Sequence, residues 1–323
     1  MHALVLGGTA FTGREIVLAL GELGFGVTVF THDIKVPEGM PPHEHFKGSR
    51  QSSEDLKRVA SVKPWDLVVD NLGYTARDLE LVLPHFRSVR RFLFHSTISL
   101  YRYIPPPMKQ PILESAVNFE VVPANEDLSD VHWQYARGKW EAERLLQRHR
   151  EFPWTSFRPT VTYGPNDLSE RGFWYLARLL EGGPILVSDK PRRFRLTASR
   201  DVALAMSCCI DELTTLHQSY HIACSEIVTL EDFIRDSAQA LGVKADIIKV
   251  SDSKLPSSLA GPLGELEIIP DLNAAIKDFN FQPTPWTKMI TETARWFEVH
   301  SGKDRKRLLH GRSDEISLAR SLG

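Results

Sequence analysis

Tyr135 and Lys139 are the pair in this sequence whose types and spacing could carry acid–base chemistry. In a helix, residues four positions apart lie on one face. An ammonium beside a phenol stabilises the phenolate and lowers the pKa of the tyrosine toward neutrality, so the phenol can exchange a proton with a substrate hydroxyl or carbonyl. Thr97, at the end of an apolar run, would orient the same substrate oxygen. Such a pair also arises by chance on many surface helices, so its interpretation depends on the surrounding elements.

A βαβ pattern near the N-terminus provides that context. Apolar runs predict strands over residues 3–6 and 27–30, and an amphipathic run predicts a helix over residues 14–23. A glycine-rich turn alone is weak support for a ligand site. A turn that follows a strand, opens a helix and precedes a second strand favours a dinucleotide site over an ordinary turn without a ligand.

Each glycine of the turn has a physical reason in a dinucleotide site. Gly7 suits the tight turn, Gly8 lets the backbone approach a pyrophosphate, and Gly13 lets the helix pack closely on the sheet. The pyrophosphate would bind the N–H groups at the helix N-terminus. Ala10 replaces the middle glycine of the pattern, and its methyl group is compatible with αR or β backbone.

The end of the second strand usually decides between NAD and NADP. An acidic residue there binds the adenosine ribose hydroxyls of NAD, whereas an arginine accommodates the extra phosphate of NADP. Thr31 and His32 hold that place, so neither rule is met. Asp33 could reach a ribose two residues late, and His32 or Lys35 could face a phosphate. The choice between NAD and NADP stays open.

Strands and helices alternate over the first hundred residues, which predicts an α/β fold, a Rossmann-type doubly wound parallel sheet. Residues 36–45, rich in proline and histidine, are expected to form a surface loop. The domain prediction is a dinucleotide-binding domain over 1–160, with its last strands from 155–225, a smaller, mainly substrate-binding region over 161–300 and a charged C-terminal tail over 301–323.

The composition restricts the kind of partner. The chain of 323 residues has a net charge of −2 and 25% charged residues, so no global field favours a nucleic acid or a membrane surface. No segment has the pattern of a signal peptide or a spanning helix, and the three cysteines lack metal-ligand spacing. We expect a cytoplasmic protein without a metal site.

Several motifs occur in a recognisable order along the chain. They are Gly7 to Gly13, Phe94 to Tyr101, Tyr135-x-x-x-Lys139, Arg158 to Pro165, Arg200 to Ala203 and Phe281-x-Pro283-Thr284-Pro285. In these motifs the chain resembles the extended short-chain dehydrogenase/reductases, the NAD-dependent epimerase/dehydratase group. The Gly-Gly-Thr-x-Phe-x-Gly form of the turn resembles an atypical branch that includes the chloroplast stem-loop RNA-binding proteins.

The resemblance implies an enzyme with NAD or NADP, in which Tyr135 is the general acid/base, Lys139 lowers its pKa and binds the ribose, and Thr97 is the hydroxyl partner. Besides Tyr135 and Lys139, the implied cofactor residues are Gly7, Thr9, Ala10, Phe11, Gly13, Thr31, His32, Leu72, Gly73, Pro159 and Val161. The predicted substrate residues are Tyr74, Ser96, Thr97, Phe173, Trp174 and Arg195. The arginine that family enzymes use here aligns with Phe194, so a solvated strand edge explains Arg195 equally well. Phe173 and Trp174 lie in an amphipathic helix, where aromatic residues more often belong to the core.

The reaction class follows from the strand tip. The related sugar 4,6-dehydratases carry Thr-Asp-Glu where this sequence has Thr97-Ile98-Ser99, and the next candidates, Glu126, Asp127 and His132, are better interpreted as loop residues or helix caps. The resemblance therefore implies hydride transfer at a secondary alcohol or ketone of a nucleotide sugar or nucleoside, with an epimerase or another enzyme that recycles its cofactor preferred. A dedicated NADPH-dependent ketone reductase and an RNA-binding module are the alternatives. Many relatives dimerise through the tyrosine-bearing helix, so the family also allows a homodimer.

Overall fold

The structure, a computed structural model, describes residues 1–32, 39–40, 43–104, 108–122, 127, 129–263, 267–302 and 305–322. The chain divides into two compact units. Unit 1 comprises Met1–Thr162, Thr197–Ala223 and Pro270–Pro283, and unit 2 comprises Tyr163–Leu196, Cys224–Ile269 and Thr284–Gly323. None of the helices in the described part of the chain is long and apolar enough to cross a membrane.

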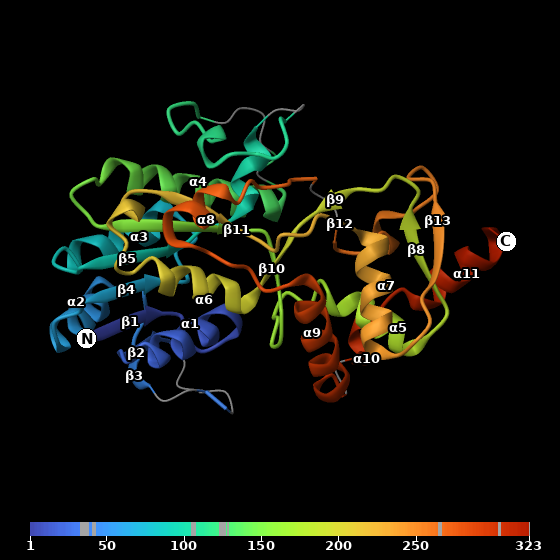
Figure 1. The fold of residues 1–323 in the computed structure, drawn as a ribbon, viewed down its shortest axis with the longest axis horizontal. Coiled ribbons are helices and arrows are strands. Elements are labelled where there is room, and N and C mark those ends of the chain that lie inside the picture. Colours follow the sequence, from blue (N-terminus) through green and yellow to red (C-terminus); the bar gives the residue numbers. More distant parts are fainter. Residues whose placement is uncertain are drawn as a thin grey trace. The chain divides into compact units, whose positions relative to one another are not determined.

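Unit 1 is built around a seven-stranded sheet in the order β11-β6-β5-β4-β1-β2-β3 (Figure 1). All neighbouring strands in it are parallel. The strand order reverses at β1, and the carboxyl ends of the strands at such a point form the ligand crevice of this architecture. The predicted doubly wound parallel sheet is confirmed. Its strands are β1 (His2–Leu6), β2 (Gly26–Thr31), β3 (Glu44–Lys47), β4 (Leu67–Asp70), β5 (Arg91–His95), β6 (Trp154–Pro159) and β11 (Ser219–Ile222).

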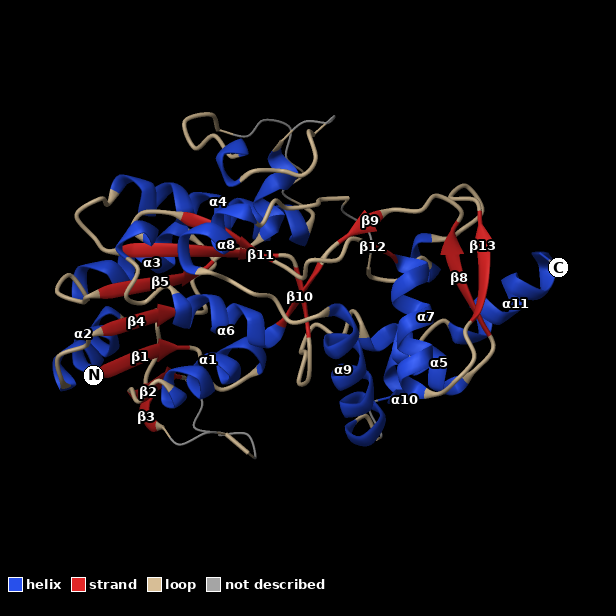
Figure 2. Cartoon of the chain, in the orientation of Figure 1, coloured by secondary structure: helices blue, strands red, loops and turns tan. Residues whose placement is uncertain are grey.

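Helices cover both faces of this sheet (Figure 2). Successive side chains of a strand point to opposite faces. Ala3 and Val5 therefore join the core under α1, and Leu4 and Leu6 join the core under α4. One face carries α1 (Phe11–Glu22), α6 (Ser199–Cys208) and α8 (Asn273–Phe279), and the other carries α2 (Ser53–Val62), α3 (Ala76–Val82) and α4 (Val131–Arg148). Three 3₁₀ helices, η1 (Leu83–His85), η2 (Ile98–Tyr103) and η3 (Glu114–Ala116), complete the described helices of this unit before residue 162.

Two boundaries in unit 1 differ from the sequence prediction. The loop expected over 36–45 gives way to β3 at Glu44, which pairs with β2 in the register Val29↔His45. Only Phe46 of this edge strand is a large apolar residue, so its pattern is that of a loop. Helix α1 begins at Phe11, three residues before the predicted start, because the glycine turn continues directly into the helix.

Unit 2 contains α5 (Phe173–Glu181), α7 (Leu230–Leu241) and α9 (Trp286–His300), with two small sheets. β8 (Pro184–Ser188) pairs in parallel with β13 (Asp246–Val250), and β9 (Arg193–Phe194) pairs in an antiparallel arrangement with β12 (Val228–Thr229). The remaining short elements of the described chain are β7 (Val161–Tyr163), β10 (Leu196–Ala198), η4 (Leu213–Thr215) and η5 (Ser257–Leu259).

The charged C-terminal tail predicted over 301–323 is helical over most of its described length. It forms α10 (Arg305–Leu308) and α11 (Arg312–Leu322). Glu315 of α11 is fully buried and pairs with Arg178 of α5 at 2.9 Å and with Arg312 at 2.8 Å. The charges of this segment are therefore partly internal ion pairs, which a count of charged residues does not distinguish from a solvated surface.

Candidate active site

The glycine turn between β1 and α1 has the geometry that a dinucleotide site needs. Gly7 has a φ of +84°, in the left-handed region. A Cβ on Gly13 would lie 2.2 Å from Gly7 O, so the helix packs against the turn only with glycine there. Ala10 is the N-cap with extended backbone, and no side chain caps this helix. The N-terminus of α1 is therefore suited to an anion.

Two residues that the sequence analysis did not single out hold this turn. Asn71, directly after β4, donates from Nδ2 to Gly7 O at 3.0 Å. Its Oδ1 accepts from Thr12 Oγ1 at 3.3 Å and lies 2.5 Å from Nδ1 of His95, the last residue of β5. Because Oδ1 is an acceptor, His95 carries its hydrogen on Nδ1. Burial and the nearby Lys139 lower the pKa of His95 to about 3, so the ring is neutral at physiological pH.

The predicted Tyr135 and Lys139 share one face of α4. Lys139 is 2% exposed and its Nζ donates to His95 O at 2.5 Å. The ammonium lies 6.0 Å from the ring centroid of Tyr135, 5.1 Å from that of Tyr74 and 4.9 Å from that of Phe94. Tyr135 itself is 38% exposed. The structure therefore brings a buried ammonium beside a solvent-accessible phenol at the carboxyl edge of the sheet.

Gly138 explains how α4 comes so close to this edge. A Cβ at this position would lie 2.4 Å from Tyr74 O and 3.2 Å from Thr75 Cγ2. The helix therefore lies directly on the backbone that follows β4. A larger residue here would push Tyr135 and Lys139 away from the turn.

The environment of Lys139 changes its protonation. Burial is the largest influence and lowers the pKa of its ammonium to about 8. Asp70 and Glu143 act in the opposite direction, and Arg50 adds to the lowering. The ammonium is thus charged at neutral pH but can lose its proton within about one pH unit of it.

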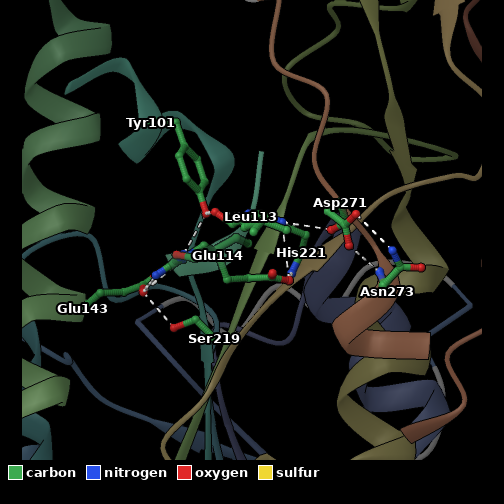
Figure 3. Close-up of polar contacts among 9 residues, drawn as sticks. Tyr101, Leu113, Glu114, Glu143, Ser219, His221, Asp271 and Asn273 are labelled. Carbon is green, nitrogen blue, oxygen red and sulfur yellow. Dashed lines mark hydrogen bonds and ion pairs between the residues drawn. The ribbon is translucent and has the colours of Figure 1, made fainter. Parts of the chain in front are cut away.

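Glu143, one turn beyond Lys139 on the same face of α4, is fully buried and anchors the helix to the sheet (Figure 3). Its carboxylate accepts from Nε of Arg158 at 3.0 and 3.1 Å and from Nη2 at 2.6 Å. Ser219 on β11 donates to the same carboxylate at 3.0 Å. This ion pair fixes the rotation of α4 and with it the direction of Lys139.

The network continues through Tyr101 to the edge strand β11 (Figure 3). Arg158 Nη1 donates to Tyr101 Oη at 2.8 Å. The same Oη lies 2.5 Å from Nε2 of His221. His221 Nδ1 lies 3.0 Å from Asp271 O and therefore carries the hydrogen, so that Tyr101 donates to Nε2. Burial and Arg158 lower the pKa of His221 to about 3. The chain of hydrogen bonds is structural, because all of these side chains are buried.

The residues predicted to contact the adenosine end lie at the carboxyl end of β2. Thr31 Oγ1 lies 2.7 Å from Nε2 of His45 on β3, and His32 is exposed. Asp33 and Lys35 lie outside the described residues. Farther along the sheet, Pro159 is buried at the end of β6 and Val161 is half-buried in β7.

Three of the predicted substrate residues are buried or half-buried in the protein. Ser96 is 1% exposed. Phe173 is 5% exposed and its ring packs on Trp296 and Phe297 at 5.7 and 4.9 Å, so it belongs to the core of unit 2. Arg195 donates from Nη1 to Cys224 O at 2.7 Å, a backbone contact that the prediction did not include. Their part in substrate binding stays a prediction, because amphipathic helices and strand edges place aromatic rings and arginines in the protein interior as readily as in a site.

Thr97 is buried and caps η2, with Oγ1 accepting from Ser99 N at 3.1 Å. Tyr74 is 48% exposed. Trp174 of α5 lies under the guanidinium of Arg178, whose Cζ is 3.2 Å from the ring centroid. Three residues were weighed as acids for an elimination. Asp127 accepts from Ser129, His132 is exposed in the first turn of α4, and Glu126 lies outside the described residues.

A separate cavity of about 310 Å³ lies within unit 2, at the carboxyl ends of β8 and β13. Its lining includes both cations and carboxylates. Lys190 and Arg192 approach Asp252 at 3.3 and 4.0 Å, and Lys249 approaches Glu231 at 2.8 Å. A cavity of this size and polarity suits part of a small polar ligand.

Solved structures share this fold. UDP-glucose 4-epimerase from Thermotoga maritima, solved with UDP-glucose, is 18% identical with a TM-score of 0.73, covering 93% of this chain and 99% of that one. dTDP-glucose 4,6-dehydratase from Bacillus anthracis, in complex with NAD, is 17% identical with a TM-score of 0.73, covering 95% and 99%.

Sequence comparison is more specific. Chloroplast stem-loop binding protein of 41 kDa b from Arabidopsis thaliana is 26% identical over 253 residues, which are 74% of this chain and 63% of that protein, so this chain spans less than two thirds of that relative. A model of the family described as "NAD dependent epimerase/dehydratase family" matches residues 51–223, more than half of the chain. The chain therefore belongs to the NAD-dependent epimerase/dehydratase family of extended short-chain dehydrogenase/reductases.

Proposed function

We propose that the protein transfers a hydride at a secondary alcohol or ketone of a nucleotide sugar, with NAD or NADP as cofactor and Tyr135 as the acid/base. The observation that carries the proposal is the buried Lys139 ammonium, which is bound to His95 O and faces the accessible phenol of Tyr135. A lysine is rarely buried without a reason, because desolvation of its charge is unfavourable. Here it stabilises the phenolate of Tyr135 when that residue has given up its proton.

The described residues fit a dinucleotide. Gly7, Gly8 and Gly13 leave no room for a Cβ, so the turn presents backbone rather than side chains, and the N-terminus of α1 has no side-chain cap. When bound, the nicotinamide supplies the hydride acceptor or donor. The chain supplies the proton: Tyr135 exchanges it with the substrate oxygen, Lys139 stabilises the resulting phenolate, and Thr97 orients the oxygen.

The substrate class rests on the structural neighbours. They are a UDP-glucose 4-epimerase solved with UDP-glucose and a dTDP-glucose 4,6-dehydratase. The Thr97-Ile98-Ser99 tip lacks the acids of a sugar dehydratase, and Asp127 is bonded to Ser129. Epimerisation is therefore preferred over elimination.

The first test of the proposal is to denature freshly purified protein and to identify any released nicotinamide cofactor by mass spectrometry. Retained NAD or NADP supports an enzyme that recycles its cofactor, whereas an empty protein that binds NADPH reversibly supports a reductase. A protein that neither retains nor binds NAD or NADP would refute the proposal. Tyr135→Phe should lower turnover by about 10²–10⁴-fold, whereas a comparable loss in Tyr74→Phe alone would assign the acid/base role to the other phenol beside Lys139.

The relative from Arabidopsis gives a specific reason for a second candidate, RNA binding on the same fold. The net charge of −2 opposes a phosphate-backbone partner. RNA affinity that falls steeply with salt and is unchanged in Tyr135→Phe would support this second candidate.

The cytoplasmic location and the homodimer stay predictions.

A further inference from the structure

Arg50, in the loop after β3, joins the turn that follows β4 to two carboxylates. Its Nη2 lies 2.6 Å from Asp70 Oδ2, and its Nη1 lies 3.0 Å from Asp78 Oδ1. Nη1 also donates to Leu72 O at 2.8 Å. The Arg50 side chain is 11% exposed and the Asp70 side chain 0%. A planar guanidinium makes these bonds in a fixed geometry that a flexible ammonium does not reproduce.

The same two carboxylates bind the backbone of the turn. Asp70 Oδ1 accepts from Leu72 N at 3.0 Å. Asp78 Oδ2 accepts from Tyr74 N and Thr75 N, each at 2.9 Å. With Arg50 on the Leu72 carbonyl, every residue from 70 to 75 except Asn71 and Gly73 is bonded within this cluster. Asn71 is bonded to the glycine turn instead.

Tyr74 connects the cluster to the lysine of the proposed site: its N donates to Asp78 Oδ2 at 2.9 Å, and its ring centroid lies 5.1 Å from Lys139 Nζ. Asp70 and Asp78 raise the pKa of Lys139, and Arg50 lowers it. Two cations and two anions thus balance around the carboxyl end of β4. The groups that face Lys139 are Arg50, Asp70, Tyr74, Asp78, Phe94, His95, Tyr135 and Glu143.

We propose that Arg50 is a positioning residue of the active site: it holds the Leu72–Tyr74 turn in place for the cofactor and balances the charges around Lys139. The proposal rests on the proposed function for the role of the turn. The charge balance is a property of the protein alone and can be measured without a cofactor or a substrate.

Lysine labelled with ¹³C at Cε gives the titration of Lys139 by NMR, with the signal assigned by its loss in Lys139→Met. The wild-type midpoint is expected at about pH 8. Arg50→Gln removes a cation and should raise the midpoint by about one pH unit, whereas Asp70→Asn removes an anion and should lower it by about one unit. General loosening of the site would raise both midpoints, because it would expose the ammonium to water. Shifts in the same direction, or no shift, would overturn the charge balance.

Arg91→Gln is the matched control. Arg91 is also buried and binds backbone carbonyls, those of Ile210 at 3.1 Å and Glu212 at 2.9 Å, but it lies at the amino end of β5. Its substitution removes a buried guanidinium without touching the turn, so the titration of Lys139 should stay at the wild-type value.

Calorimetric titration with NAD⁺ and NADP⁺, on protein from which any retained nicotinamide cofactor has first been removed, tests the turn. Arg50→Gln and Arg50→Lys should each weaken binding of the accepted dinucleotide by about tenfold, and Arg50→Lys should keep the wild-type midpoint of Lys139. Equal affinity of wild type and Arg50→Gln would overturn the positioning role while leaving the proposed function intact. If the wild type binds neither dinucleotide, the proposed function and the cofactor role of the turn fail together, and the NMR result then decides the charge balance alone.

Discussion

Lys139→Met should stabilise the protein at neutral pH while it removes activity. The pKa of the buried ammonium is lowered from 10.5 to about 8, a difference that corresponds to about 3 kcal/mol of unfavourable free energy in the folded state. Methionine has a similar length and carries no charge. It forfeits the hydrogen bond from Nζ to His95 O, a loss of about 1–2 kcal/mol. The net expectation near pH 7 is a gain of about 1–2 kcal/mol in the free energy of unfolding.

The pH dependence identifies the cause. Below pH 8 the ammonium is protonated in both states, and the folded state carries the full desolvation penalty. Between about pH 8 and 10.5 the unfolded state binds more protons, so this penalty disappears and the wild type gains stability relative to the variant. The advantage of Lys139→Met should therefore shrink and then reverse as the pH rises.

Urea unfolding followed by tryptophan fluorescence measures this difference at a series of pH values. A constant difference between wild type and Lys139→Met over this range would refute the reasoning, because it would mean that the pKa of Lys139 is the same in both states. Turnover measured on the same samples should fall by about 10²–10⁴-fold. A gain in stability with a loss of activity is the expected behaviour of a group kept for function.

Two further substitutions on α4 test its packing. Gly138→Ala places a Cβ 2.4 Å from Tyr74 O. The overlap should lower the free energy of unfolding by about 1–3 kcal/mol, more than the higher helix propensity of alanine adds. Gly21→Ala on α1 has no atom within 4 Å of the new Cβ and should raise the free energy of unfolding by up to about 1 kcal/mol in the same urea experiment. Glu143→Gln leaves the buried guanidinium of Arg158 without a counter-charge and should cost about 3–5 kcal/mol by thermal or urea unfolding. Glu141→Gln, which breaks a half-buried pair with Arg137 on the same helix, should change stability by less than about 1 kcal/mol. A destabilised Gly21→Ala or a neutral Glu143→Gln would contradict the packing described.

The sequence predicted the elements whose signal is local. Strands β1 and β4 are continuous apolar runs, the glycine turn has its spacing within seven residues, and Tyr135 and Lys139 are separated by one helical turn. Each of these patterns depends on near neighbours in the chain, so periodicity and turn chemistry are sufficient to find them.

The features that the sequence did not reveal depend on distant partners. Arg50 finds its carboxylates 20 and 28 residues later, and Arg178 finds Glu315 137 residues later. No local pattern distinguishes these arginines from solvated ones. The sequence analysis therefore missed the burial of Glu315 in the charged C-terminal segment, and it did not identify Arg50.

The face of α4 combines these two kinds of information. Tyr135, Lys139 and Glu143 follow one another at successive turns, and their exposed fractions fall from 38% to 2% and 1%. The deepest residue, Glu143, is held by Arg158 in three hydrogen bonds, and this fixes the helix in rotation. Because the helix cannot turn, Lys139 is kept out of water although its charge would favour exposure, and the phenol of Tyr135 is held at the surface beside it. The ion pair at the inner end of the face therefore maintains the unfavourable burial of the lysine in its middle, and that burial keeps the pKa of the ammonium close to neutral.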